Sequence, residues 1–324
     1  MKNLSSSYHA DHHTALTQSV VPSVSSSYDN ELPLPRANTT NFFYSFSFLP
    51  KDEREAMHHI YAFCRYTDDI VDESWLPTLT TQILPLQETD ETIRKKRERL
   101  QRWRSEVDKC YEGTSLHPIL RPLTAVVQRF SIPKQYLHIL IDGCERDLMQ
   151  TRYQTFEELK EYCFGVAGIV GLMSIEIFGY KYDDTKEYAV YLGYALQLTN
   201  IMRDVKVDKD KGRIYLPLED LERFHITEDD LFREQYSEKF VDLMQFQARR
   251  TREYYHKARA ALRPDEGFSM FAAQIMDGIY YRLLEKIELA NFDVFHNKIR
   301  VSTSHKLLIA LRLWAKTRLL LKRA

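Results

Sequence analysis

Glycine and proline are scarce along this sequence. Only 10 glycines and 11 prolines occur among its 324 residues, and these two residue types interrupt helices most strongly. Hydrophobic residues make up 44% of the chain, which is enough for a substantial core. Long helices are therefore favoured over a sandwich of short strands, and the predicted fold class is all-α.

Residues 1–38 differ from the rest of the chain. They are rich in Ser, His and Thr and have no helical or strand period, so we predict a flexible N-terminal tail. Helical patterns follow without a clean linker, and residues 39–324 are predicted to form one domain. Two prolines and several threonines predict a loop over 76–90. The last three helices are expected over 227–263, 267–291 and 303–322.

Charge and cysteine content exclude several classes of protein. The formal net charge is -1, so no basic field marks a nucleic-acid-binding protein. The sequence contains no run of 18 apolar residues, so no membrane-spanning helix is predicted. It has no basic start followed by an apolar stretch, so no secretory signal is predicted. The cysteines stand far apart without metal-finger spacing, which is typical of reduced thiols in a cytoplasmic protein. They are Cys64, Cys110, Cys144 and Cys163.

Two segments, YAFCRYTDDIVDE and QLTNIMRDVKVD, carry several carboxylates on helices that are otherwise apolar. Side chains three or four residues apart share one face of a helix. Asp68 and Asp72 therefore form a stripe on the first helix, and Asp204 and Asp208 form one on the second.

This spacing by itself also fits the solvated faces of surface helices. The remaining surface of both helices is apolar, however, which predicts that they lie inside a bundle. A carboxylate there is costly unless a cation or a proton compensates it. Two facing stripes offer hard oxygen ligands for Mg²⁺, an ion that bridges protein carboxylates to substrate phosphates. The pattern predicts binding of a diphosphate and its stabilisation as a leaving group.

The acidic segments belong to a longer pattern. RYTDDIVDE is followed by YCFGVAGIVGLM and then by ALQLTNIMRDVKVDKDKGRIYLPLEDL. In this order and spacing they closely resemble the squalene/phytoene synthase family, over nearly everything from Thr39 to Leu313. The resemblance implies an isoprenoid-synthase-type helical bundle around a central cavity. It also implies Mg²⁺-dependent head-to-head condensation of two allylic prenyl diphosphates through a cyclopropyl diphosphate, with Mn²⁺ as an alternative ion.

The resemblance assigns the metal ligands to the two stripes. Asp68 and Asp72 would form the first aspartate motif, and Asp204 and Asp208 the second, with Asn200 as a further ligand.

Other roles are implied in the same way. Tyr162 matches a tyrosine that the family places near the reacting carbons, where a phenol can steady a cation or move a proton toward the departing diphosphate. The implied substrate-binding residues are Arg65, Tyr61, Gln197, Asn200, Arg203, Phe42 and Tyr280.

The segment GVAGIVG, residues 165–171, places small residues at one-turn intervals of a helix. One interpretation is tight helix packing. The other is an apolar tunnel for prenyl tails, lined by aromatic residues such as Phe42, Phe43 and Phe46, that keeps water from a carbocation.

The C-terminal segment SHKLLIALRLWAKTRLLLKRA mixes leucines with Lys and Arg and includes Trp314. Its apolar face either caps the bundle or rests on an anionic membrane as a basic amphipathic helix. The predicted partners are prenyl diphosphates and, through this helix, a membrane surface, with no nucleic acid. The predicted location is the cytoplasm or its membrane surface.

Two products remain compatible with the resemblance. A phytoene synthase, which is the reading we favour, would use two C20 geranylgeranyl diphosphates. A bacterial presqualene diphosphate or squalene synthase would use two C15 farnesyl diphosphates, and NADPH is expected only if squalene is the product. A non-catalytic assembly homologue is a more remote alternative, because such relatives tend to lose the aspartates. A terpene cyclase usually has an NSE-type second motif, which this chain lacks.

Overall fold

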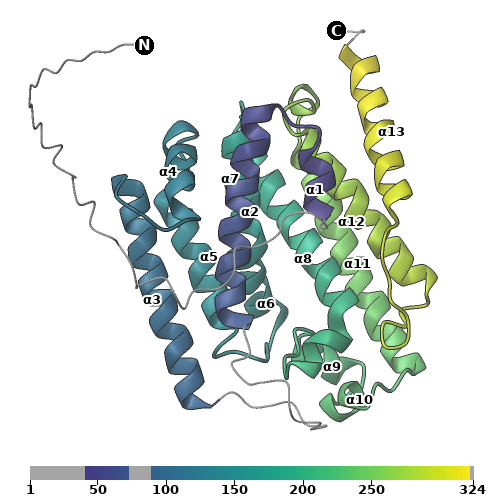
Figure 1. The fold of residues 1–324 in the computed structure, drawn as a ribbon. Coiled ribbons are helices and arrows are strands. Elements are labelled where there is room, and N and C mark those ends of the chain that lie inside the picture. Colours follow the sequence, from purple (N-terminus) through teal and green to yellow (C-terminus); the bar gives the residue numbers. More distant parts are fainter. Residues whose placement is uncertain (1–40, 73–88, 322–324) are drawn as a thin grey trace, which may run out of the picture. The chain divides into compact units, whose positions relative to one another are not determined.

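Helices make up almost all of the regular structure (Figure 1). The computed structural model describes residues 41–72 and 89–321, excluding the side chains of 41–43 and 316–321. Within these ranges the β pairing is one isolated bridge, between Arg152 and Ile214, which confirms the all-α prediction. The first half comprises α1 (Asn41–Phe46), α2 (Lys51–Asp72), α3 (Asp90–Glu112), α4 (Leu120–Arg129), α5 (Lys134–Arg146), α6 (Phe156–Cys163), the π-helix η1 (Phe164–Gly168) and α7 (Ile169–Phe178). The second half comprises α8 (Asp184–Asp210), α9 (Leu218–Arg223), α10 (Glu228–Phe232), α11 (Glu238–Ala261), the 3₁₀-helix η2 (Pro264–Glu266), α12 (Phe271–Leu289) and α13 (Thr303–Leu321).

Local sequence sets the ends of several helices. The Thr89 hydroxyl accepts a hydrogen bond from the backbone N–H of Thr92 at the start of α3, and Gly113 ends that helix in the left-handed conformation, with a φ of 77°. Ser237 caps α11 through the backbone N–H of Phe240. Such caps satisfy backbone groups that have no partner within the helix.

Helix α8 occupies the centre of the bundle. It packs along α11 and against α7, η1 and α12. Helix α2 packs against α3, α4, α5 and α7. The two helices that carry the acidic stripes, α2 and α8, therefore each pack against at least four other elements, as their apolar surroundings predicted. Figure 1 shows α8 at the centre and α2 in front of α7.

Small residues let neighbouring helices approach closely. A Cβ atom placed on Gly143 of α5 would lie 2.7 Å from the backbone of Gly165 in η1. A Cβ atom on Gly171 of α7 would lie 2.5 Å from the backbone oxygen of Ala189 in α8. The packing interpretation of GVAGIVG is therefore confirmed, because a side chain at Gly165 or Gly171 would press against the backbone of a neighbouring helix.

The sequence-based boundaries were wrong in one region. The helix expected over 227–263 is divided into α10 and α11. Between them Glu234 has a positive φ of 54°, and Ser237 then caps a new helix. The predicted tail, 1–38, lies outside the described residues, as does the predicted loop over 76–90 apart from its last two residues, which begin α3.

One segment of the described residues, Phe156–Phe178, is long and apolar enough to cross a membrane, with a mean hydropathy of 1.5. It joins α6, η1 and α7. The sequence-based prediction of no membrane-spanning helix considered only uninterrupted apolar runs, and it therefore missed this segment. Within the bundle 56% of the apolar window is buried, and contacts with α2, α5 and α8 account for its composition as that of a core helix.

Candidate active site

A cavity of about 620 Å³ lies among α2, α5, α6, α7, α8 and α12. At one end its wall is polar and includes eight of the residues that the sequence singled out. They are Tyr61, Arg65, Asp68, Tyr162, Gln197, Asn200, Arg203 and Tyr280. The fold thus gathers side chains from α2, α6, α8 and α12 into one site.

The rest of the cavity is apolar. Its wall includes Val166, Val170, Ile175, Phe178, Leu192, Ala273 and Met276. Phe46 lines it as predicted, whereas the side chains of Phe42 and Phe43 lie outside the described part of the structure. Met57 lines it eleven residues before Asp68 on α2, so the cavity extends about 16 Å along that helix.

On α2, Arg65 binds two acidic residues. Its guanidinium donates to Asp68 Oδ2 at 3.0 Å and pairs with Asp69 Oδ1 at 2.7 Å. These contacts hold the cation beside Asp68 at the polar end of the cavity.

On α8, a second set of polar side chains faces the same space. Arg203 Nε donates to Asp204 Oδ1 at 2.7 Å, and a second guanidinium nitrogen binds the other oxygen of that carboxylate. The Asn200 amide donates to Gln197 at 3.4 Å, but Asn200 Oδ1 is buried without a hydrogen-bond partner. A buried acceptor in this state is destabilising unless a donor or a cation reaches it.

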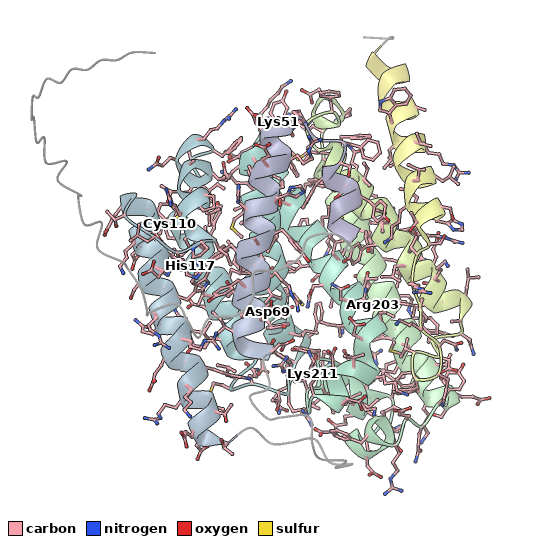
Figure 2. All side chains as sticks on the ribbon, in the orientation of Figure 1. Lys51, Asp69, Cys110, His117, Arg203 and Lys211 are labelled. Atoms are coloured by element: carbon pink, nitrogen blue, oxygen red, sulfur yellow. The ribbon has the colours of Figure 1, made fainter. Side chains whose placement is uncertain are left out.

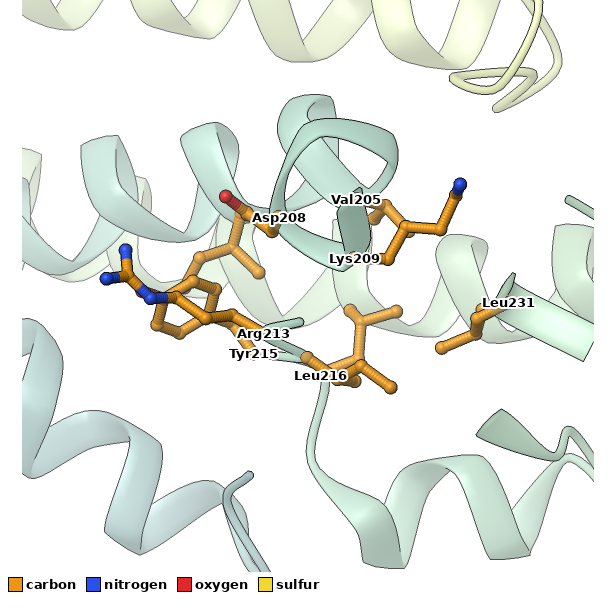
Figure 3. Close-up of a pocket in the computed structure, with 9 residues that line it drawn as sticks. Val205, Asp208, Lys209, Arg213, Tyr215, Leu216 and Leu231 are labelled. Carbon is orange, nitrogen blue, oxygen red and sulfur yellow. The ribbon is translucent and has the colours of Figure 1, made fainter. Parts of the chain in front are cut away.

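Two cations from the turn after α8 bind the first acidic stripe. Lys211 Nζ donates to Asp72 Oδ2 at 2.6 Å, and Arg213 Nη1 donates to Asp72 Oδ1 at 2.8 Å. Figure 2 shows Lys211 just beyond the C-terminal end of α8. Figure 3 shows Asp208 and Arg213 pointing to the same side of this turn, whereas Lys209 points the other way. The C-terminal ends of α2 and α8 are therefore joined by ion pairs.

Asp147, the residue that follows α5, belongs to the site and was missed in the sequence. It lines the cavity and only 9% of its side chain is exposed. Its two oxygens accept hydrogen bonds from the hydroxyls of Tyr162, at 3.0 Å, and Tyr215, at 2.8 Å. Arg213 lies 3.9 Å away. A helix end has no 3.6-residue repeat, so no periodic signal marks Asp147. Lys211 and Arg213 lie within the quoted family pattern, but nothing in their spacing indicated a partner on α2.

Burial and like charges raise the pKa of two motif carboxyl groups. Asp68 faces the cavity with 46% of its side chain exposed, yet the surrounding protein, and then the charge of Asp72, raise its pKa to about 6, against the effect of Arg65. Burial and then Asp204 raise the pKa of Asp208 to about 7. Both groups titrate near neutral pH, where a carboxylate that lacks a compensating cation takes up a proton.

The pKa values of the other titratable residues in the site depend on burial and on the partners of each residue. Burial alone would raise the pKa of Asp72, but Arg213 and Lys211 outweigh it, and the pKa is lowered. Burial raises the pKa of Asp147, although Arg213 and the two tyrosine hydroxyls oppose it. Burial and the charge of Asp147 raise the pKa of Tyr162 well above its usual value. Tyr162 therefore keeps its proton at any physiological pH.

The two stripes fit a hard divalent cation in their chemistry. Carboxylate and amide oxygens are the ligands that Mg²⁺ takes in proteins. A cation would give the partnerless Asn200 Oδ1 a partner, and it would offset both the burial and the like charges that raise the pKa of Asp68 and Asp208. Within the described ranges, no three His, Cys, Asp or Glu side chains group closely enough to hold an ion. Phosphate oxygens or waters would therefore complete the coordination shell.

Comparisons with known proteins agree with this architecture. The family model described as squalene/phytoene synthase matches residues 35–305. The phytoene synthase of Arthrospira platensis is 35% identical over 283 residues, which cover 82% of this chain and 85% of that protein. The 15-cis-phytoene synthase of Synechocystis sp. is 33% identical and covers 86% of this chain and 82% of that protein.

Among solved structures, a dehydrosqualene synthase in complex with a ligand superposes with a TM-score of 0.71 and 27% identity, covering 87% of this chain and 93% of that chain. The squalene synthase of Alicyclobacillus acidocaldarius has a TM-score of 0.68 and 25% identity, covering 80% of this chain and 92% of that chain.

Proposed function

This chain belongs to the squalene/phytoene synthase family, and from that membership we propose that it condenses two allylic prenyl diphosphates head to head through a cyclopropyl diphosphate. It is a prenyltransferase that releases diphosphate, and its catalytic part is proposed to be residues 39–324. The proposed substrate is C20 geranylgeranyl diphosphate and the product phytoene, because the relatives at 35% and 33% identity are phytoene synthases.

The observation that carries the proposal is a single cavity with a charged end and an apolar remainder. A prenyl diphosphate has the same division, with a charged head and a hydrocarbon tail. Asp68, Asn200 and Arg203 line the charged end, and Val170 and Met276 line the apolar part. One molecule of substrate thus meets matching surroundings at both of its ends.

The basic residues would bind the diphosphates. Arg65 and Arg203 now bind carboxylates at the cavity wall, and a guanidinium matches phosphate oxygens equally well. Lys211 and Arg213 hold Asp72 in the same way. When substrate arrives, these cations would exchange carboxylate oxygens for phosphate oxygens without leaving the site.

The carboxylates would hold divalent ions, with Mg²⁺ proposed and Mn²⁺ as the alternative. When bound, the ions would neutralise the charge that develops on the leaving diphosphate. The proposed ligands are Asp68, Asp72, Asn200, Asp204 and Asp208. Their stripes lie on rigid helices, α2 and α8, so their spacing is set before substrate binds.

Tyr162 and Asp147 would act at the reacting carbons. Tyr162 retains its proton and lines the cavity, so its ring and hydroxyl oxygen are available to steady an allylic cation. Its hydrogen bond to Asp147 fixes the orientation of the phenol. As the phenol oxygen accepts the proton lost on cyclopropane closure, its own hydroxyl proton would pass along the hydrogen bond to the Asp147 carboxylate, so that no charge stays on the phenol. The apolar wall keeps water from the cation.

The alternative product has support of its own, because the similar solved structures include a dehydrosqualene synthase and a squalene synthase. The deciding experiment incubates purified protein with Mg²⁺ and labelled C15 or C20 diphosphate, with and without NADPH, and identifies the products by mass. We expect phytoene from the C20 substrate, without a need for NADPH. Conversion of only the C15 substrate would assign the alternative, and no conversion of either would contradict the proposal. The location proposed is the cytoplasm, at a membrane surface that supplies and receives lipids.

A further inference from the structure

The connection from α5 to α6 runs beside the turn that follows α8. The backbone N–H of Ile214 donates to the carbonyl oxygen of Thr151 at 3.0 Å, and Arg152 and Ile214 form the isolated parallel bridge. The N–H groups of residues 218–219 donate to the carbonyl oxygens of residues 153–154, at 2.9 and 3.0 Å. Two connections that are distant in sequence, and that each carry residues of the candidate active site, are therefore fastened together.

The side chain of Arg152 adds a link between these connections and α10. Its Nε and Nη2 donate to the two carboxylate oxygens of Glu228, the first residue of α10, at 2.9 Å each. Its Nη1 donates to the carbonyl oxygens of Thr151, at 2.8 Å, and Gly212, at 2.6 Å. A guanidinium fits these acceptors because its donors are fixed in one plane, and a lysine ammonium cannot reproduce the same pattern. We call the bonds from Arg152 to Glu228 and Gly212 the Arg152 clamp.

The peptide group between Gly212 and Arg213 is held at both of its polar atoms. Arg152 binds its carbonyl oxygen, and its N–H donates to the carbonyl oxygen of Asp208 at 2.9 Å. The side chains on either side of Gly212 are those of Lys211 and Arg213, the two cations that bind Asp72. Figure 3 shows Arg213 extending from this turn on the same side as Asp208. The clamp therefore fixes the backbone from which both cations reach the site.

Arg152 itself stands outside the cavity. Neither Arg152 nor Glu228 belongs to the cavity wall, so neither would touch a ligand there. The pair with Glu228 would by itself only fasten α10 to the connection before α6. The bond to the Gly212 carbonyl reaches the turn that carries the site's cations, and it gives Arg152 a role beyond fastening α10.

We propose that Arg152 is a positioning residue, which holds Lys211 and Arg213 at the site while Asp72 exchanges its ion pairs for a divalent cation. In the metal-free protein Asp72 binds both cations. Once Asp72 binds metal instead, the turn loses these ion pairs and keeps its backbone contacts and the Arg152 clamp. The clamp should therefore matter most when metal and diphosphate are bound, and the inference rests on the proposed function for the identity of that ligand.

The test compares Arg152→Lys with the wild type by hydrogen exchange and by ligand binding. Mass spectrometry of peptides over residues 209–216 reports how firmly the turn is held, and we expect its amides to exchange about tenfold faster in the variant. Calorimetric titration with inorganic pyrophosphate in excess Mg²⁺ should give a Kd about tenfold higher than that of the wild type, because contacts from two cations are weakened.

Arg252→Lys is the matched control. Arg252 binds both carboxylate oxygens of Glu288 on α12, does not line the cavity, and has 29% of its side chain exposed, against 23% for Arg152. Loss of this pair should speed exchange in α11 and α12 but leave exchange over 209–216 and the Kd for pyrophosphate as in the wild type. Equal rises in Kd for the two variants would overturn the inference, since a general loss of stability would then explain both.

Other outcomes separate this inference from the proposed function. Unchanged exchange over 209–216 in Arg152→Lys would overturn the clamp, and so would faster exchange with an unchanged Kd, because the turn would then not depend on Arg152 for binding. A wild type that does not bind pyrophosphate with Mg²⁺ would contradict the proposed function alone, and the exchange rates would then decide whether Arg152 holds the turn. If Arg152→Lys loses its helical circular dichroism, Glu228→Gln replaces it, with changes in the same direction expected from both measurements.

Discussion

At the scale of single residues, the site is a set of carboxylates that the protein's own cations compensate unevenly. Asp72 is held by Lys211 and Arg213, and Asp204 by Arg203. Asp68 and Asp208 are compensated less, and each has a raised pKa. The protein's own cations therefore occupy some carboxylate oxygens that divalent ions are proposed to bind. The proposed reaction would depend on how these contacts are exchanged.

Removing one carboxylate from either stripe should stop the reaction while preserving the fold. For Asp68→Asn and Asp204→Asn we expect turnover to fall on the order of 10²- to 10³-fold or more, because each variant loses electrostatic stabilisation of the leaving group. The matched control is Asp210→Asn, since Asp210 follows the second stripe on α8 but is 59% exposed and pairs with Lys209. Steady-state kinetics with saturating Mg²⁺ and circular dichroism are the measurements. Normal turnover of either stripe variant would show that the metal assignment is wrong.

Tyr162 and Tyr215 offer a paired test of catalysis against structure. Each donates one hydrogen bond to Asp147, so Tyr162→Phe and Tyr215→Phe should each lower the free energy of unfolding by about 1 kcal/mol. Only Tyr162 lines the large cavity, whereas Tyr215 lines a small pocket beside Asp208. We expect kcat to fall roughly 10²-fold or more for Tyr162→Phe and much less for Tyr215→Phe. Equal losses of kcat would instead mean that Tyr162 acts only through Asp147.

At the scale of helices, sequence periodicity predicted the residues that share a helix face, but it did not predict the residues beyond helix ends. The stripes on α2 and α8 follow from spacing alone, and both helices pack against several others, as expected. Asp147, Lys211 and Arg213 were missed because they lie beyond helix ends, where their positions depend on how separate elements pack. The split between α10 and α11 was missed because it depends on the backbone of Glu234 and the cap at Ser237. The family pattern covered Lys211 and Arg213 in sequence but did not reveal their ion pairs.

The crossing of α5 and η1 predicts a sharp effect of one methyl group. Gly143→Ala would place Cβ 2.7 Å from the backbone of Gly165, and backbone on both sides cannot yield as a side chain does. We expect the free energy of unfolding in urea to fall by about 1–3 kcal/mol. Gly113→Asn is the control, because Gly113 has a φ of 77° with nothing within 4 Å of the added atom, and Asn tolerates that conformation. A Gly143→Ala protein as stable as the wild type would show that this contact is not tight.

At the scale of the whole molecule, the cavity joins the charged end of the site to an apolar space that several helices enclose. On α12, Tyr280 lines the polar end and Ala273 lies seven residues, or about 10 Å, further along. Neither the volume nor the length of this space can be inferred from any one segment of the sequence. Sequence reasoning therefore identified the family and predicted carboxylate ligands, but the length of the tail that the cavity accepts depends on how α2, α7, α8 and α12 pack together.

Filling the apolar part should change which substrate is used. Ala273→Phe would shorten the space for the tail, and we expect kcat/KM for the C20 diphosphate to fall about tenfold or more relative to that for the C15 diphosphate. The control is Ala260→Phe, since Ala260 is exposed on α11 and does not line the cavity. Parallel assays with the two substrates give the ratio. An unchanged ratio would mean that prenyl tails do not lie along α12.

The stability of the metal-free protein should depend on pH through Asp68 and Asp208. Their pKa values of about 6 and about 7 lie above the usual value of 3.8, so the folded state takes up protons before the unfolded state does. Their contribution to stability is therefore absent above pH 7 and grows as the pH falls toward 4. Mg²⁺ needs the ionised carboxylates, and the rise in Tm that it causes should be larger at pH 8 than at pH 5.5. The double variant Asp68→Asn/Asp208→Asn isolates these two groups from Asp72, whose lowered pKa acts in the opposite direction. If the wild type and the double variant showed the same pH profile and the same response to Mg²⁺, neither carboxylate would lie where a cation binds.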